Sequence, residues 1–164
     1  MNYSTVRHEL KSGDIVFWSH TDWRSKNGVL LNIVRVFTKS NFGHVALVWR
    51  TGGRIFLIEA APPVVRIVPL SDRLPCYIAR IPFTINRETI NYALSQVGKP
   101  YSKWEAIKAF FNKNTDGESN WECAKLVNKV LGKIKPDFES VQDTPSKLFQ
   151  HLVKKYNVHL IYLE

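Results

Sequence analysis

The sequence predicts an α+β domain, in which helices pack on one side of an antiparallel sheet. Short β-rich apolar runs dominate the first half of the chain, and amphipathic helical patterns dominate the second half. This segregation argues against a doubly wound parallel sheet. There is no P-loop and no G-x-G-x-x-G motif, so nothing indicates nucleotide binding. A length of 164 residues fits one domain spanning 1–164.

The expected strands are apolar runs bounded by turn signals. The clearest pair is a hairpin, because two β-rich runs flank a turn that contains two glycines. The strands and the hairpin turn are predicted as follows: Gly13–Trp18, His44–Trp49, the turn at Thr51–Arg54, Ile55–Ala60, Val64–Val68, Tyr77–Ile81 and Val158–Tyr162.

The expected helices have amphipathic patterns and recognisable ends. Gly98 stops one of them, and Thr144 with Pro145 opens the last as N-cap and first helical residue. Val29–Phe37 has mixed periodicity, which weakly favours a helix over a strand. The remaining helices are predicted at Arg87–Val97, Lys103–Phe111, Glu122–Leu131 and Thr144–Lys154, with a polar loop at Asn112–Asn120.

The composition, 45% hydrophobic and 23% charged, is that of a soluble globular protein. No apolar run is long enough to cross a bilayer, and Met1–Leu10 lacks the apolar core of a secretory signal. A cytoplasmic protein is therefore expected, unless lysis or a viral particle releases it. The two cysteines form neither a disulfide framework nor a metal-type C-x-x-C pair, so no metal or other cofactor is expected.

The net charge of +9 fits an anionic partner, such as nucleic acid, an anionic membrane surface or a cell-wall polymer. A merely soluble basic surface explains it equally well. The sequence has no run of five like charges and no recognisable nucleic-acid-binding motif. Specific nucleic-acid binding is therefore not expected.

Cys123 is the candidate nucleophile, because it lies at the start of a predicted helix with Ser119 or Asn120 as N-cap. Free N–H groups and the helix dipole stabilise negative charge there. The pattern therefore predicts a lowered pKa for the Cys123 thiol, and N–H donors for a developing oxyanion. The alternative is a small buried apolar residue.

His44 and Glu59 are the candidate base and orienting carboxylate for that nucleophile. His44 opens one strand of the predicted hairpin, and Glu59 ends the other strand after an apolar run. A turn at Gly52 and Gly53 makes them near neighbours at the open end of the hairpin. The alternatives are a structural histidine at a strand edge and an exposed carboxylate paired with Arg66.

The sequence gives weaker support for a chemical role of the other candidate residues. Tyr101 could supply a hydroxyl near the site, or it is a half-buried aromatic residue. Cys76 has no base nearby in sequence and is interpreted as structural. A zinc site formed by His44, Glu59 and Cys123 would lack any standard ligand spacing. The remaining histidines lack a matching context: His8, His20, His151 and His159.

Taken together, these segments resemble a known family. Gly98–Tyr101 (GKPY) followed by Trp121–Val127 (WECAKLV) resembles the G-x-P-Y … C-x-x-L-V signature of NlpC-type papain-like cysteine peptidases. Here Gly43–Val48 (GHVALV) and Ile58–Ala60 (IEA) precede the cysteine, which resembles the circularly permuted branch that includes the lecithin–retinol acyltransferase group and poxviral relatives. The resemblance covers roughly residues 12–150. Supporting segments are Ser12–Val16 (SGDIV), Val65–Leu70 (VRIVPL) and Thr144–Ser146 (TPS).

The resemblance implies a permuted papain-like fold and a Cys123–His44–Glu59 triad. It implies acyl transfer through a Cys123 thioester, with N–H groups at the helix start such as that of Ala124, and with the Tyr101 hydroxyl, holding the oxyanion. The expected substrate is an amide, with cell-wall peptide as the leading case. The alternatives are a lipid acyl hydrolase or acyltransferase using the same triad, and a non-catalytic basic binding module. The chain departs from the family pattern at Ala124, where a serine is usual, and in a long polar insert before Cys123.

Overall fold

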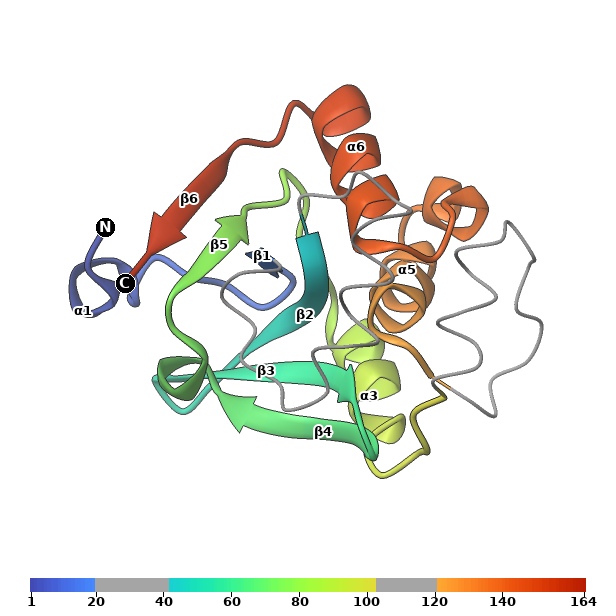
Figure 1. Ribbon diagram of the computed structural model, residues 1–164, viewed down its shortest axis with the longest axis horizontal. Helices are drawn as coiled ribbons and strands as arrows, with labels where there is room; N and C mark the ends of the chain where they lie inside the picture. Colours follow the sequence, from blue (N-terminus) through green and yellow to red (C-terminus); the bar gives the residue numbers. More distant parts are fainter. Residues whose placement is uncertain (20–41, 103–120) are drawn as a thin grey trace.

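The computed structural model describes residues 1–19, 42–102 and 121–164, and its centre is a six-stranded antiparallel sheet with the strand order β4-β3-β2-β1-β5-β6 (Figure 1). The predicted α+β class with a helix-packed antiparallel sheet is confirmed. The strands are β1 (Ile15–Ser19), β2 (Phe42–Thr51), β3 (Arg54–Ala61), β4 (Val64–Pro69), β5 (Cys76–Ala79) and β6 (Leu160–Leu163).

The predicted hairpin forms β2 and β3, which pair from Thr51 with Arg54 to Leu47 with Ile58. Gly52 and Gly53 have φ values of 54° and 74°, a left-handed conformation that glycine adopts without steric cost. The other predicted strands are also present, with ends shifted by a few residues. No strand end lies more than two residues from its predicted position, and β5, for example, ends two residues before the predicted Ile81.

Three helices cover one face of the sheet: α3 (Arg87–Ser95), α5 (Cys123–Gly132) and α6 (Pro145–Tyr156) (Figure 1). Their apolar residues share a core with alternate residues of β1, β2 and β3, such as Phe17, Leu47 and Ile58. As predicted, the Thr144 side chain caps α6 and Pro145 is its first residue.

The opposite face of the sheet carries a second, smaller core that includes Val16, Ala46 and Leu57. Two short elements that the sequence analysis missed cover this face: α1 (Tyr3–Val6) and the 3₁₀ helix η1 (Leu70–Arg73). A third missed element is η2 (Pro136–Ser140), which packs against α5. Such short helices have too few residues to show a hydrophobic period.

Several predictions lie outside the described residues: the helix at Val29–Phe37, the helix at Lys103–Phe111 and the loop at Asn112–Asn120. In the described part of the chain, no helix has both the length and the apolar character that crossing a membrane requires.

The two hairpin strands part towards their open end, and this divergence prepares the candidate site. β2 and β3 pair as far as Leu47 and Ile58; beyond that point β2 follows β1, and β3 follows β4. Figure 1 shows β2 bending away from β3 there. His44 and Glu59 both lie in the separated part. Because the ladder is open, backbone N–H groups of β2 can meet a side chain from α5.

Candidate functional site

His44 and Glu59 are in direct contact, as the hairpin geometry predicts. His44 Nε2 lies 3.2 Å from Glu59 Oε2. Both residues are buried, with exposed fractions of 6% for His44 and 0% for Glu59. The Trp18 ring packs on the imidazole with a centroid separation of 5.3 Å, because Trp18 is the cross-strand partner of His44 in β1. The imidazole is therefore held by a carboxylate at one nitrogen and by an indole face.

Glu59 is also held by two arginines. Arg66 Nε donates to Glu59 Oε1 at 2.8 Å, and Arg73 Nη2 donates to the same oxygen at 2.7 Å. Arg66 faces Glu59 across the β3–β4 ladder, and Arg73 comes from η1. Glu59 therefore binds both Arg66 and His44, and the alternative of an exposed carboxylate is wrong. Oε1 accepts hydrogen bonds from the two guanidinium groups, and Oε2 contacts the histidine.

These contacts keep Glu59 ionised. Burial alone would raise its pKa, but hydrogen bonds and charge interactions with His44, Arg73 and Arg66 prevail and lower the pKa to about 2. A carboxylate that stays charged and accepts from an imidazole N–H fixes the ring orientation and the tautomer. This is the chemistry that an orienting residue supplies to a catalytic base.

The backbone carbonyl of Arg73 links the residues around Glu59 to those around His44. The Trp18 indole N–H donates to the Arg73 carbonyl oxygen at 2.7 Å. The same Arg73 binds Glu59, and the same Trp18 packs on His44. The sequence analysis missed Arg73 and Trp18, because nothing in a one-dimensional pattern links η1 to the start of β2.

Cys123 is the first residue of α5 and is buried, with 7% exposed. The backbone N–H groups of Val45 and Ala124 point at the thiol and favour its charged form. Val45 follows His44 in β2. Cys123 and Val45 share the core beneath the helices, whereas Trp18, the cross-strand partner of His44, belongs to the core on the opposite face. Ala124, a predicted oxyanion donor, follows Cys123 in the first turn of α5, and its N–H faces both the sulfur and the Glu122 carboxyl.

The predicted low thiol pKa at Cys123 is wrong for this structure. Burial and the neighbouring Glu122 carboxyl raise the pKa of the Cys123 thiol well above its ordinary value, and outweigh the two N–H contacts. A helix start lowers a thiol pKa only when the site is partly exposed or cationic. Here the thiol is neutral at rest, so its proton must leave as it reacts.

Glu122 was not predicted as a residue of the site. It is the N-cap of α5 in place of the predicted Ser119 or Asn120, and its Oε1 accepts from the Lys125 backbone N–H. Its other oxygen, Oε2, accepts a hydrogen bond from the Cys123 thiol at 3.7 Å. Glu122 is 3% exposed, and burial raises its pKa to about 8. The sequence could have indicated this role, because Glu122 directly precedes Cys123.

Tyr101 lies beside the same cluster. It is partly exposed, pairs by its backbone with Trp121, and is close enough to Cys123 and Glu122 for both to raise its pKa, with burial the main cause. Its hydroxyl therefore stays protonated and able to donate. Cys76, by contrast, is fully buried in the smaller core at the start of β5, and burial raises its pKa to about 12. This agrees with a structural role.

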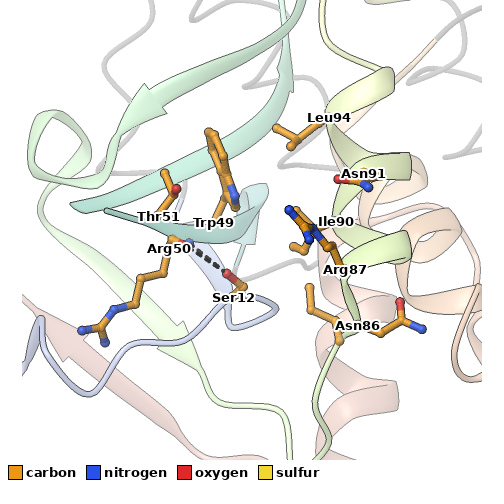
Figure 2. A pocket seen from close by; sticks show the side chains of 10 residues that line it. Ser12, Trp49, Arg50, Thr51, Asn86, Arg87, Ile90, Asn91 and Leu94 are labelled. Atoms are coloured by element: carbon orange, nitrogen blue, oxygen red, sulfur yellow. Dashed lines mark hydrogen bonds between the residues drawn. The ribbon is translucent and has the colours of Figure 1, made fainter. Parts of the chain in front are cut away.

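A surface cavity of about 350 Å³ lies elsewhere, between the outer end of β2 and α3 (Figure 2). Trp49, Arg50 and Thr51 form one wall, and side chains of α3 and the segment before it form the other: Ile85, Asn86, Arg87, Ile90, Asn91 and Leu94. None of the predicted site residues lines it. The cavity and the candidate site are therefore distinct.

The described residues also bear on the alternative of a metal site. Across residues 1–19, 42–102 and 121–164, no three histidine, cysteine, aspartate or glutamate side chains are grouped as a metal ion would require. The alternative of a zinc site at His44, Glu59 and Cys123 therefore has no geometric support within this part of the chain.

Comparisons with known proteins show a fold likeness and no family. No protein-family model and no curated protein matches the chain. Among solved structures, the chain is similar to the metalloprotein yiiX from Escherichia coli O157:H7, which carries the label DUF1105. The TM-score is 0.56 and the identity 19%, over 77% of this chain and 67% of that one. This likeness concerns the fold alone.

Proposed function

We propose that the protein is a cysteine-nucleophile hydrolase in which Cys123 attacks, His44 is the general base and Glu59 orients His44. The observation that carries the proposal is the buried His44–Glu59 contact of 3.2 Å, one residue from the Val45 N–H that meets the Cys123 thiol. Acyl transfer requires a nucleophile, a base and an orienting carboxylate. Here His44 contacts Glu59 and adjoins in β2 the residue whose N–H meets the Cys123 thiol.

In the proposed reaction, the Cys123 sulfur attacks a substrate carbonyl carbon while His44 takes the thiol proton. N–H groups at the start of α5, with the Tyr101 hydroxyl, stabilise the oxyanion. His44 then gives its proton to the leaving amine, and a thioester on Cys123 remains. Water loses a proton to His44, attacks the thioester and releases the acid, which restores the thiol.

The permuted papain-like fold belongs to the same proposal. Support comes from the order of the elements, with the histidine and glutamate strands before the nucleophile helix, and from the sequence resemblance described above. The proposed substrate is an amide, with cell-wall peptide as the leading case. A net charge of +9 would favour association with anionic cell-wall polymers.

Hydrolysis of short cell-wall peptides, followed by chromatography, tests this function. Cys123→Ala should abolish turnover, and His44→Ala should lower kcat by about 10²–10⁴-fold. Glu59→Gln keeps the shape but loses the charge, and it should lower kcat with little change in KM. Cys76→Ala is the matched control and should retain activity. Full activity in Cys123→Ala would contradict the proposal.

The same variants separate the alternatives. Release of fatty acid from phospholipid vesicles, lost in Cys123→Ala and without peptide cleavage, would favour the lipid acyl hydrolase. No turnover of either substrate, with binding to nucleic acid that weakens steeply with salt, would favour the basic binding module.

A further inference from the structure

The Glu122 carboxyl is buried, caps the nucleophile's helix and touches the nucleophile itself. Its Oε2 is 3.7 Å from Cys123 Sγ, and its Oε1 accepts from the Lys125 backbone N–H. The peptide geometry of an N-cap leaves this side chain little freedom, because it must fold back over the first turn of the helix. The carboxyl and the thiol are therefore kept together.

The groups that face Glu122 come from four parts of the chain. Cys123 and the backbone N–H groups of Ala124 and Lys125 belong to α5, and Asp143 precedes α6. Tyr101 lies on the segment after α3, and β2 contributes the Val45 N–H at the shared thiol. Asp143 is the charged neighbour that disfavours ionisation of Glu122, and the hydrogen-bond donors to Glu122 are backbone N–H groups and the thiol.

We propose that Glu122 is a positioning residue that governs the nucleophile: its protonated carboxyl holds the Cys123 thiol in place, and its ionisation at alkaline pH suppresses formation of the thiolate. The reason is electrostatic. Two negative charges less than 4 Å apart in a buried site repel each other strongly, so the second ionisation is disfavoured once the first has occurred. Burial, which raises the pKa of Glu122 to about 8, supports this coupling in an accessible pH range.

The inference rests on the proposed function for its effect on turnover, but the coupling itself is measurable without a substrate. Below pH 8 the neutral carboxyl leaves His44 to take the thiol proton. Above it, the proton lost from Glu122 goes to solvent and leaves a carboxylate against the sulfur. Hydrolysis should therefore decline on the alkaline side, where an ordinary thiol gains reactivity.

The test is the rate of Cys123 alkylation by iodoacetamide between pH 6 and 10, read by peptide mass spectrometry in wild type and Glu122→Gln. Each rate is divided by that protein's own rate at pH 6.5. In the variant, which keeps the capping oxygen, the normalised rate should exceed that of wild type by about tenfold or more at pH 9.5, since one unit of coupling corresponds to tenfold. If the ratio of the variant's normalised rate to that of wild type does not change with pH, the proposal is overturned.

Controls make either result interpretable. Glu9→Gln removes an equal charge from an exposed carboxylate that pairs with Arg80, and it should follow wild type. Glu122→Ser keeps an N-capping side chain if Glu122→Gln fails to fold. Thiolate absorbance at 240 nm, taken as the difference from the matching Cys123→Ala protein, reports ionisation even where iodoacetamide reacts slowly. A thiolate titration that is identical in wild type and the Glu122 variants also overturns the proposal.

The two proposals fail separately. A pH-dependent alkylation ratio without hydrolysis of any substrate would leave the coupling intact and reject the hydrolase. Hydrolysis that depends on Cys123 and His44, together with a flat ratio, would retain the hydrolase and reject the role of Glu122.

Discussion

Glu59 divides its two carboxylate oxygens between different partners. Oε1 accepts from Arg66 and Arg73, and Oε2 contacts His44. A lone carboxylate beside a buried histidine could take up a proton or rotate. With both guanidinium groups in place, the Glu59 carboxylate keeps its charge and its plane is fixed, and this orients the His44 ring.

Loss of one guanidinium group should lower the stability of the protein as well as disturb the site. Arg73→Gln removes a charged donor from a buried carboxylate and should lower the free energy of unfolding by about 1–3 kcal/mol. The matched control is Arg80→Gln, whose partner Glu9 is exposed, and it should change stability by less than about 1 kcal/mol. Urea denaturation at pH 7 measures both; equal effects would contradict the special role of Arg73.

The ionisation of Glu59 also predicts how stability depends on acid. Its pKa is lowered from 4.5 to about 2 in the folded protein. The stability that it contributes is therefore fully present above pH 4.5, and is lost as the pH falls through about 2. Asp137, which interacts with Lys155, His151 and Tyr156 and also has its pKa lowered to about 2, behaves similarly.

Comparison of wild type with Glu59→Gln isolates the Glu59 contribution, because Asp137 is present in both proteins. Between pH 4.5 and 2, the unfolding free energy of wild type should fall more steeply by up to about 1.4 kcal/mol per pH unit. Chemical denaturation at several pH values measures this difference. Parallel curves would show that Glu59 is not held ionised.

At the scale of elements, the start of β1 is fixed by a close approach. Gly13 has φ of 99°, and an added Cβ would lie 3.0–3.1 Å from the Ile85 side chain. This glycine belongs to the SGDIV segment, whose last two residues begin β1. A glycine there satisfies both the backbone conformation and the packing of the turn on Ile85, which lies two residues before α3.

Gly13→Ala should therefore destabilise the protein more than Gly98→Ala. Gly98 has a similar φ of 87° but has open space around its Cβ position. Backbone strain costs on the order of 1 kcal/mol at each site, and the Ile85 contact adds to it at Gly13 alone. Thermal or urea unfolding of the two variants measures the difference. Equal losses would mean that Ile85 moves aside freely.

At the scale of the whole molecule, periodicity predicted most of the fold. The hairpin of β2 and β3, the helix α3 and the capped helix α6 all have local signals that tertiary packing does not override: paired glycines, an amphipathic stripe, and Thr144 followed by Pro145. That His44 and Glu59 lie near each other was predictable for the same reason, since a tight turn fixes the register of the two strands, although their ladder ends at Leu47 and Ile58.

The rest depends on segments that are distant in sequence. Arg73 reaches Glu59 from η1, and Trp18 reaches His44 across the sheet, and no short-range pattern encodes either contact. The thiol pKa was mispredicted because a helix start was considered without its burial and without the Glu122 cap. Electrostatics of this kind is a property of the assembled core.

The central claim, that Cys123 is a nucleophile served by His44, is tested most directly by trapping the acyl-enzyme. The protein would be incubated with a p-nitrophenyl ester and mapped by peptide mass spectrometry. We expect an acyl group on Cys123 and none on the fully buried Cys76, with slower acylation in His44→Ala. Absence of an acyl group on Cys123, or acylation that is indifferent to His44, would contradict the account.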